Sequence, residues 1–380
     1  MRWKVGFRDN SLELCLFLFR FGLIMSKANG YKVLGLMSGT SLDGLDMALC
    51  KFWKEGRWKY EFLQSDTIAY PAELKNKLKN ALDRDEDYIR LLDLEYGTYL
   101  AEMVHLFRLK TKEEIDFVAS HGHTVRHQPD KGITLQIGNG KILAELSRLP
   151  VVNNFRKQDV DLGGQGAPLV PIGDRELFYE YDACLNLGGF SNLSWEEMGQ
   201  RRACDLSVCN MLLNEIAQLH HLEYDEDGAM ARKGKIINEL LDEWNALAFY
   251  SQPAPKSLGR EWYLENYPIG SLKKQYTVED LSATASVHIA VQINSFIRKI
   301  FSNKPKILVT GGGRFHRYLM EQLSVVMEFQ EVEGNRQLIE FKEAMIFAFL
   351  GVLRWEGEIN VLSSVTGASK DHCSGDLYYP

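Results

Sequence analysis

One aspartate and three glycine-rich turns are the parts of this chain best suited to chemistry. Asp205 stands among apolar neighbours in ACDLSVCNML, where a carboxylate acts either as a helix cap or as a general base with a raised pKa. The turns lie near Gly39, Gly188 and Gly312, each after a short apolar strand. Because glycine lets the backbone approach a phosphate closely, three such turns predict a nucleotide-binding site.

The first turn, SGTSLDGLD, offers groups that suit phosphate and magnesium. Hydroxyls and backbone amides bind phosphate oxygens. We expect Mg²⁺ to be held through water near Asp43 of this turn or near Asp205. The turn is not a Walker loop, because it has no lysine. The alternative is a tight hairpin whose serine and threonine side chains cap their own backbone. The residues that we assign to this nucleotide-binding turn are Ser38, Gly39, Thr40, Ser41, Leu42, Asp43 and Gly44.

The second and third turns lie in the other half of the chain, in LNLGGFSN and VTGGG. The third stands between a buried strand and a helix, where helix amides can meet a phosphate. Its spacing does not match a dinucleotide fold, and close packing of strand on helix is the alternative explanation. The predicted nucleotide-binding residues of these turns are Gly188, Gly189, Gly311, Gly312 and Gly313.

Two polar segments suit a sugar or an anion. SHGHTVRHQP gathers three histidines around Arg126, and an arginine repels a metal cation, so we favour a polar ligand over a metal. NNFRKQDVDLGGQGAPLVP combines Arg156, Asp159 and Gln165 with several glycines. We expect it to be an irregular segment between two domains, where ligands and hinges both occur.

Alternating strands and helices are expected to position these groups. Apolar runs predict strands on both sides of the first two turns, within 31–52 and 183–194, and further strands at 117–119 and 307–310. Residues 121–127 are expected to form a turn. Helical spacing predicts helices at 72–82, 87–110, 210–221, 235–249, 282–301, 317–326 and 343–356. The pattern indicates an α/β fold, and the repeated strand–turn–strand unit indicates a duplicated domain around a central interdomain cleft.

Bulk properties restrict the function classes. The chain has 380 residues, of which 45% are hydrophobic and 25% charged, so two soluble globular domains are expected. A net charge of −7 without a basic stripe disfavours a nucleic-acid partner. The six cysteines form no CxxC pair, which disfavours zinc and disulfide frameworks and favours the reducing cytoplasm.

The first thirty residues, 1–30, differ from the rest and are expected to lie outside the fold. Their apolar run is interrupted by Glu13 and Arg20, is short for a membrane span and fits a signal peptide poorly. We therefore expect no membrane association and interpret Met25 as the natural start. The alternative is a weak export or membrane-surface segment.

The whole pattern resembles the anhydro-N-acetylmuramic acid kinases, in the actin, hexokinase and heat-shock ATPase superfamily. The resemblance extends from about Val33 to Pro380, through LMSGTSLDGLD, SHGHTVRHQP, LQIG, FRKQDVDLGGQGAPLVP, LNLGGFSN, PKSLGRE, VTGGG, KEAMIFAFL and SVTGA. It implies a two-lobed actin-like ATPase fold of the ribonuclease H-like kind. Lobe I would comprise 31–165 plus about 361–380, and lobe II would comprise 166–360.

The resemblance also implies an activity. The family uses ATP and Mg²⁺ to open the 1,6-anhydro bridge of anhydro-N-acetylmuramic acid and to phosphorylate O6, giving N-acetylmuramic acid 6-phosphate in cell-wall sugar recycling. The family's catalytic aspartate falls on Asp205, and the asparagine of its nucleotide site falls on Asn210. The partner is then a small sugar, and a homodimer is compatible with this reading. The predicted substrate-binding residues are His123, Thr124, Arg156, Gln165 and Glu343.

The chain departs from the family pattern at two places. Residues 207–209 are serine, valine and cysteine where the family usually has glycine, proline and glycine, and Asn154 replaces an aspartate. These changes leave two alternatives open, a kinase for a different sugar and an ATP-binding pseudokinase. The retained Asp205 and Asn210 argue against the pseudokinase.

Overall fold

The computed structural model describes residues 29–39, 42, 44–329 and 335–380. The predicted N-terminal extension and the start at Met25 therefore lie almost entirely outside the described residues, as do Thr40, Ser41 and Asp43 of the first turn. Among the described residues no helix has both the length and the apolar character needed to cross a membrane.

Two main sheets form the framework of the molecule. The strands of the first are β1 (Tyr31–Ser38), β2 (Leu45–Glu55), β3 (Arg57–Ile68), β4 (Phe117–Ser120), β7 (Val151–Asn153) and β12 (Asp376–Tyr378). Those of the second are β8 (Ala183–Leu187), β9 (Phe190–Glu197), β10 (Gln200–Val208) and β11 (Ile307–Thr310). A two-stranded sheet contains β5 (His123–Gln128) and β6 (Ile133–Ile137).

The two main sheets repeat one topology. Their strand orders are β12-β7-β4-β1-β2-β3 and β10-β9-β8-β11. In each sheet three successive strands pair antiparallel, and the next strand pairs parallel to the first of them, β4 to β1 and β11 to β8. The repeated order confirms the α/β class and the duplicated strand–turn–strand unit.

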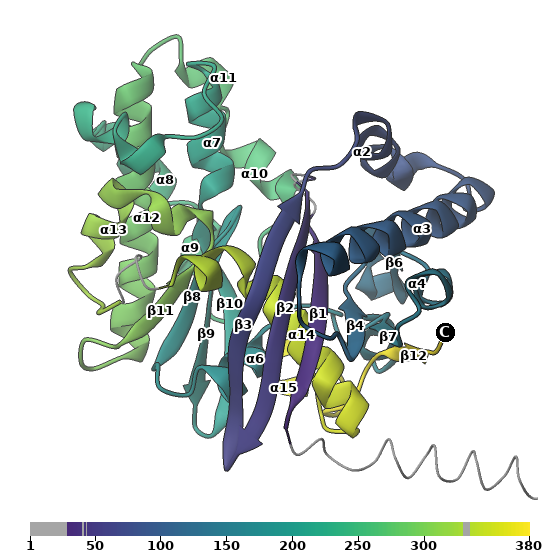
Figure 1. The fold of residues 1–380 in the computed structure, drawn as a ribbon. Helices are drawn as coiled ribbons and strands as arrows, with labels where there is room; N and C mark the ends of the chain where they lie inside the picture. The colour runs from purple at the N-terminus through teal and green to yellow at the C-terminus, as the bar shows by residue number, and fades with distance from the viewer. Residues whose placement is uncertain (1–28, 40–41, 43, 330–334) are drawn as a thin grey trace, which may run out of the picture.

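Helices surround both sheets (Figure 1). The long ones are α3 (Glu86–Lys110), α12 (Val278–Ile300) and α14 (Arg336–Glu356). The shorter ones are α2 (Ala72–Lys79), α4 (Gly140–Ser147), α5 (Lys157–Asp161), α6 (Pro171–Leu177), α7 (Asn210–Gln218), α8 (Asn238–Asn245), α9 (Ala248–Ser251), α10 (Arg260–Asn266), α11 (Ile269–Leu272), α13 (Arg317–Leu323) and α15 (Ser363–Thr366). Single 3₁₀ turns are η1 (Ala81–Asp83), η2 (Pro129–Lys131), η3 (Glu226–Gly228), η4 (Ala231–Lys233) and η5 (Gly312–Phe315).

The strands β1, β2 and β4 of the first sheet are buried on both faces, which explains their near-continuous apolar runs. Along β1, Leu34 and Leu36 face the core that contains α3, while Val33 belongs to the core that contains α14. Gly35 is required where α14 crosses the strand, because a Cβ there would lie 1.9 Å from the Ala344 carbonyl oxygen. Strand alternation therefore decides which residues contact each helix.

Helix α14 lies between the two sheets (Figure 1). Its core also contains Cys184 of β8 and Leu308 of β11, so residues of both sheets pack on one helix. A buried ion pair, Lys342 Nζ to Asp174 Oδ1 at 2.7 Å, joins α14 to α6. The packing of α14 on both sheets neither places nor excludes the predicted lobe boundaries, which stay a prediction.

One predicted segment is wrong. Residues 121–127 are not a turn, because most of them belong to β5, which pairs antiparallel with β6. Gly132, at φ +71°, provides the left-handed backbone that closes this hairpin. The strand escaped detection because it is polar, with His127 and Gln128 exposed, and so lacks the apolar alternation of a half-buried strand.

Candidate active site

Ser38, at the end of β1, is tied into a buried chain of hydroxyls. Its Oγ accepts a hydrogen bond from the Tyr70 hydroxyl at 2.7 Å and lies 3.0 Å from His123 Nδ1. The Tyr70 hydroxyl also lies 2.8 Å from that of Tyr96. Burial lowers the pKa of His123 to about 4, so the neutral ring can accept the Ser38 proton. The Ser38 hydroxyl is thus engaged within the protein.

The predicted substrate residues His123 and Thr124 are neighbours on β5 with different surroundings. His123 is 4% exposed and contacts Ser38, which favours a structural role. Thr124 is half-buried and accepts a long hydrogen bond, 3.4 Å, from Gln136 Nε2. Their roles toward a substrate stay predictions.

Arg156, just before α5, is held from two sides. Its Nη1 donates to the Gly166 carbonyl oxygen at 2.6 Å, while Nε and Nη2 lie 3.0 and 2.8 Å from His121 Nε2. His121 Nδ1 donates to the Gly122 carbonyl oxygen at 2.9 Å, which leaves Nε2 as an acceptor. Burial, followed by the charge of Arg156, holds the pKa of His121 well below its ordinary value. A neutral histidine therefore positions the arginine.

Glu343 of α14 is the acidic neighbour of Arg156. Burial lowers the pKa of Arg156 to about 10 against the attraction of Glu343, and burial raises the pKa of Glu343 against the attraction of Arg156. Both side chains nevertheless reach solvent, since Arg156 is half-buried and Glu343 is exposed. The structure thus places a guanidinium and a carboxylate near each other where solvent reaches both.

Gln165 completes this group. Its side chain is exposed, its backbone N–H donates to the Thr366 carbonyl oxygen at 2.8 Å, and the next residue is Gly166, which contacts Arg156. The structure thus brings Arg156, Gln165 and Glu343 together. The sequence indicated that the segment containing His121 is polar, but it did not predict His121 as a site residue. Its contact with Arg156 is what distinguishes it from His123.

The third glycine turn packs against the end of β8. Gly311 has φ +84°, and a Cβ there would lie 2.5 Å from Asn186 Oδ1. A Cβ on Gly313 would lie 2.8 Å from the Cβ of Leu187. Packing alone therefore requires these two glycines, which is the alternative that the sequence left open.

Asn210 lies beside the exposed glycine of the third turn. Its Nδ2 donates to the Leu187 carbonyl oxygen at 2.8 Å and lies 3.3 Å from where a Cβ on Gly312 would be. The carbonyls of Gly188 and Gly189 accept from the first amides of α7 at 3.0 and 3.2 Å, so this turn caps the helix. Gly189 and Gly312 are both exposed, and a bare backbone of this kind can approach a phosphate.

Asp205 lies on β10, where the pairing with β9 shifts before Ser207. Its Oδ2 accepts from the Leu258 N–H at 2.8 Å and from Ser257 Oγ at 3.3 Å, and its own N–H donates to the Lys256 carbonyl oxygen at 3.0 Å. Burial raises the pKa of Asp205 above its ordinary value, although the two donors oppose the shift. No hydrogen bond from the described residues reaches Oδ1, so one oxygen is held and the other can take a proton.

Asp205 does not act as the cap of α7. That helix begins after Cys209, and the carbonyls of the second turn occupy its first amides. Cys209 has φ −144° and ψ −107°, so it does not occupy the left-handed region that most favours glycine.

The other departure, Asn154, has a direct explanation. Its Nδ2 donates to Asp376 Oδ2 at 2.7 Å, where an aspartate would oppose a like charge. Its φ of +58° is tolerated by asparagine as well as by aspartate.

These residues and their order along the chain match one family of sugar kinases. The family model described as anhydro-N-acetylmuramic acid kinase matches residues 31–380. The chain belongs to the anhydro-N-acetylmuramic acid kinase family. Relatives with this name include that of Pseudomonas syringae pathovar tomato, 33% identical over 362 residues, and that of Pseudomonas putida, 35% identical over 367 residues. Each alignment covers 91% of this chain and 98% of the relative, so the resemblance to anhydro-N-acetylmuramic acid kinases is confirmed.

Solved structures of two other proteins resemble the chain more distantly. The ROK hexokinase of Thermus thermophilus is 13% identical, with 84% of this chain and 99% of that chain covered and a TM-score of 0.37. Component A of the (R)-2-hydroxyglutaryl-CoA dehydratase of Acidaminococcus fermentans is 12% identical, with 83% and 99% covered and a TM-score of 0.42. Scores this low support no conclusion about this kinase family member.

Proposed function

We propose that this chain is an ATP-dependent carbohydrate kinase that hydrolyses the 1,6-anhydro bridge of anhydro-N-acetylmuramic acid and phosphorylates O6. The product is N-acetylmuramic acid 6-phosphate, as expected in cell-wall sugar recycling. One observation supports the chemistry most directly: Asp205 has a raised pKa, one oxygen held by two donors and one oxygen without a donor from the described residues. Family membership over residues 31–380 supplies the substrate class.

Asp205 is the proposed general base. Its Oδ1 accepts a proton from the water whose oxygen bonds to the anomeric carbon, while the bond from that carbon to O6 breaks. The released O6 then bonds to the γ-phosphorus of ATP, and ADP leaves. Base catalysis of this kind contributes about 10²–10⁴-fold to a rate.

Arg156, Gln165 and Glu343 are the proposed sugar-binding residues. Arg156 has five N–H groups, and its contacts with His121 and Gly166 leave one on each terminal nitrogen for a ligand. His123 and Thr124 are less well placed, because His123 already contacts Ser38.

The residues near Asn210 fit the phosphates of ATP. Gly189 and Gly312 leave exposed backbone there, and the first turn adds the backbone of Gly39, which is half-buried. No group of three metal-binding side chains occurs among the described residues, so we propose that Mg²⁺ is held through water by Asp205 or Asp43. When bound, ATP with Mg²⁺ supplies the phosphoryl group and offsets its negative charge.

A cytoplasmic location and a homodimer belong to the proposal as well. All five described cysteines are free thiols, which supports a reducing compartment. Light scattering on the purified chain would test the homodimer.

Mass spectrometry in ¹⁸O-water tests the reaction. With anhydro-N-acetylmuramic acid, ATP and Mg²⁺, the expected product carries phosphate on O6 and one ¹⁸O at the anomeric carbon. Phosphate transfer without bridge opening, or label between C6 and phosphorus, would contradict the mechanism. A panel of other sugars in the same assay checks the substrate.

A further inference from the structure

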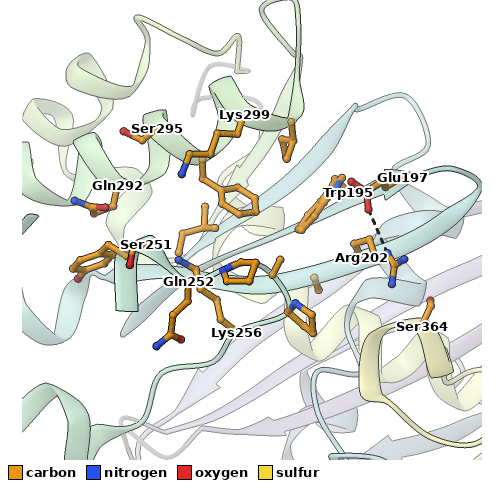
Figure 2. Close-up of a pocket in the computed structure, with 18 residues that line it drawn as sticks. Trp195, Glu197, Arg202, Ser251, Gln252, Lys256, Gln292, Ser295, Lys299 and Ser364 are labelled. Carbon is orange, nitrogen blue, oxygen red and sulfur yellow. Dashed lines mark ion pairs between the residues drawn. The ribbon is translucent and has the colours of Figure 1, made fainter. Parts of the chain in front are cut away.

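A recess lies on the outer part of β9 and β10, and neither Arg156 nor Glu343 lines it. It has a volume of about 710 Å³, within the range of small-molecule sites. Helix α12, residues 250–256 and the two strands form its walls, and Ser364 of α15 lies at one end (Figure 2). Nothing in the proposed reaction uses this space.

Two lysines face each other across the recess. Lys299 comes from α12 and Lys256 from the segment before α10, on opposite sides of the space (Figure 2). Neither forms an ion pair with a described carboxylate, and Lys256 Nζ donates only to the Phe249 carbonyl oxygen at 3.1 Å. The one acidic residue of the lining, Glu197, instead contacts Arg202 at 3.5 Å.

The two ammonium groups repel each other. Burial and the charge of Lys299 together lower the pKa of Lys256. A bound anion would supply the missing countercharge and would accept charge-assisted hydrogen bonds from both groups.

The rest of the lining suits a sugar ring. Phe296 is half-buried and forms one wall, and the buried Trp195 ring packs edge-to-face against it with the ring centroids 5.3 Å apart. Aromatic faces bind the C–H face of a sugar, and side-chain amides and hydroxyls bind its hydroxyl groups. The polar groups at hand are Ser251, Gln252, Gln292 and Ser295.

We propose that this recess is a second binding site, for a sugar that carries an anionic group, either a phosphate or a carboxylate. Lys256 and Lys299 bind the anion, and the half-buried ring of Phe296 binds the sugar ring. Such a ligand is of the same chemical kind as the proposed substrate or product, but the site lies outside the machinery that would process it.

The recess is connected to the strand that carries Asp205. The backbone of Lys256 accepts from the Asp205 N–H at 3.0 Å. The Tyr250 hydroxyl, also in the lining, lies beside Ser207 and the backbone of Val208. Two lining residues thus contact the segment next to the proposed base. A ligand bound in the recess would act on Asp205 through these contacts.

Isothermal titration calorimetry on the full chain tests the site without depending on turnover. The probes are glucose 6-phosphate, glucuronate, glucose and inorganic phosphate. We expect at least one anionic sugar to bind, and Lys299→Gln to weaken that binding about tenfold or more, since one charge-assisted contact is lost. Arg298→Gln removes the same charge from the adjacent helix position, outside the lining, and should leave binding unchanged.

A second variant, at a different lining residue, shows whether the effect of Lys299→Gln arises in the recess itself. Ser295→Glu places a carboxylate four residues before Lys299, a pairing that stabilises a helix, and it should abolish binding of the anionic sugar. Preferred binding of glucose 6-phosphate identifies the ligand as a phosphorylated sugar, and preferred binding of glucuronate identifies it as a carboxylated one. Three results would overturn the proposal: binding unaffected by Lys299→Gln, equal binding of uncharged glucose, or inorganic phosphate binding as tightly as the sugars.

Discussion

The two charged centres of the candidate site are held in opposite ways. Arg156 donates to His121 and to the Gly166 carbonyl, so contacts within the protein use most of its N–H donors. Asp205 receives both of its side-chain contacts on Oδ2, which leaves Oδ1 without a donor among the described residues. The cation is arranged to bind in one orientation, while the carboxylate keeps one oxygen free to react.

The supports of the two centres also differ in chemistry. Arg156 depends on a histidine that must stay neutral to accept its hydrogen bonds. Asp205 depends on a backbone amide and a hydroxyl, neither of which titrates near neutral pH. Acid should therefore disturb the first centre through its support and the second centre through the carboxylate itself.

The largest expected effect tests the reacting oxygen. Asp205→Asn keeps the shape of the side chain but cannot accept the proton of water, so kcat should fall about 10²–10⁴-fold. Nucleotide affinity should change little, because the glycine turns are intact. Turnover, nucleotide titration and thermal melting are measured on the same preparation. Retained turnover in a folded variant would remove Asp205 from the mechanism.

Arg156→Lys tests whether the arginine binds rather than reacts. A lysine cannot contact His121 and the Gly166 carbonyl in the same fork-like geometry, and the remaining donor to the sugar is misplaced. We expect KM for the sugar to rise about 10- to 100-fold, with a smaller change in kcat. Arg126→Lys is the matched control, since Arg126 contacts Glu86 and the Arg84 carbonyl instead. A change confined to kcat would contradict a binding role.

Acid should weaken the fold through its buried histidines. Burial lowers the pKa of His123 to about 4, below the ordinary value of 6.5, so the unfolded chain binds a proton between these values that the folded chain does not. The stability present above pH 6.5 is thus lost as pH falls toward 4, by about 1.4 kcal/mol per pH unit from this residue. Urea unfolding at several pH values should show that the free energy of unfolding falls less steeply with decreasing pH in His123→Asn than in the wild type.

Exposed His105 provides the matched variant, His105→Asn, for that series. Burial also lowers the pKa values of His121 and His288. These two residues therefore contribute to the slope of the free energy of unfolding against pH in every variant. An identical slope in the wild type and His123→Asn would mean that the contact of His123 with Ser38 survives protonation.

The smallest expected effect concerns Ser257. Ser257→Ala removes one donor from Asp205 Oδ2, which raises the pKa of Asp205 further, so the acidic limb of kcat/KM should move to higher pH. The plateau should change less than about tenfold, because the Leu258 amide still holds the carboxylate. Ser257→Thr keeps the hydroxyl and should restore the profile. An unmoved limb in Ser257→Ala would show that Leu258 alone holds Asp205.

The sequence determined the elements whose signals are local. Apolar runs around glycine predicted both hairpins, and helical spacing predicted α3, α12 and most of α14. Motifs along almost the whole chain predicted the family, which the family match confirms. Each of these signals lies within a few tens of residues, where spacing and composition reflect secondary structure directly.

Only the tertiary structure decided which side chains meet. Ser257 and Leu258 stand 52 and 53 residues after Asp205, and His121 stands 35 residues before Arg156, so no spacing rule could pair them. The third glycine turn shows the same limit. The sequence left phosphate binding and packing as equal explanations, whereas the contacts require Gly311 and Gly313 for packing and leave Gly312 exposed. A contact between distant residues depends on how whole elements pack, and that arrangement is a property of the folded chain.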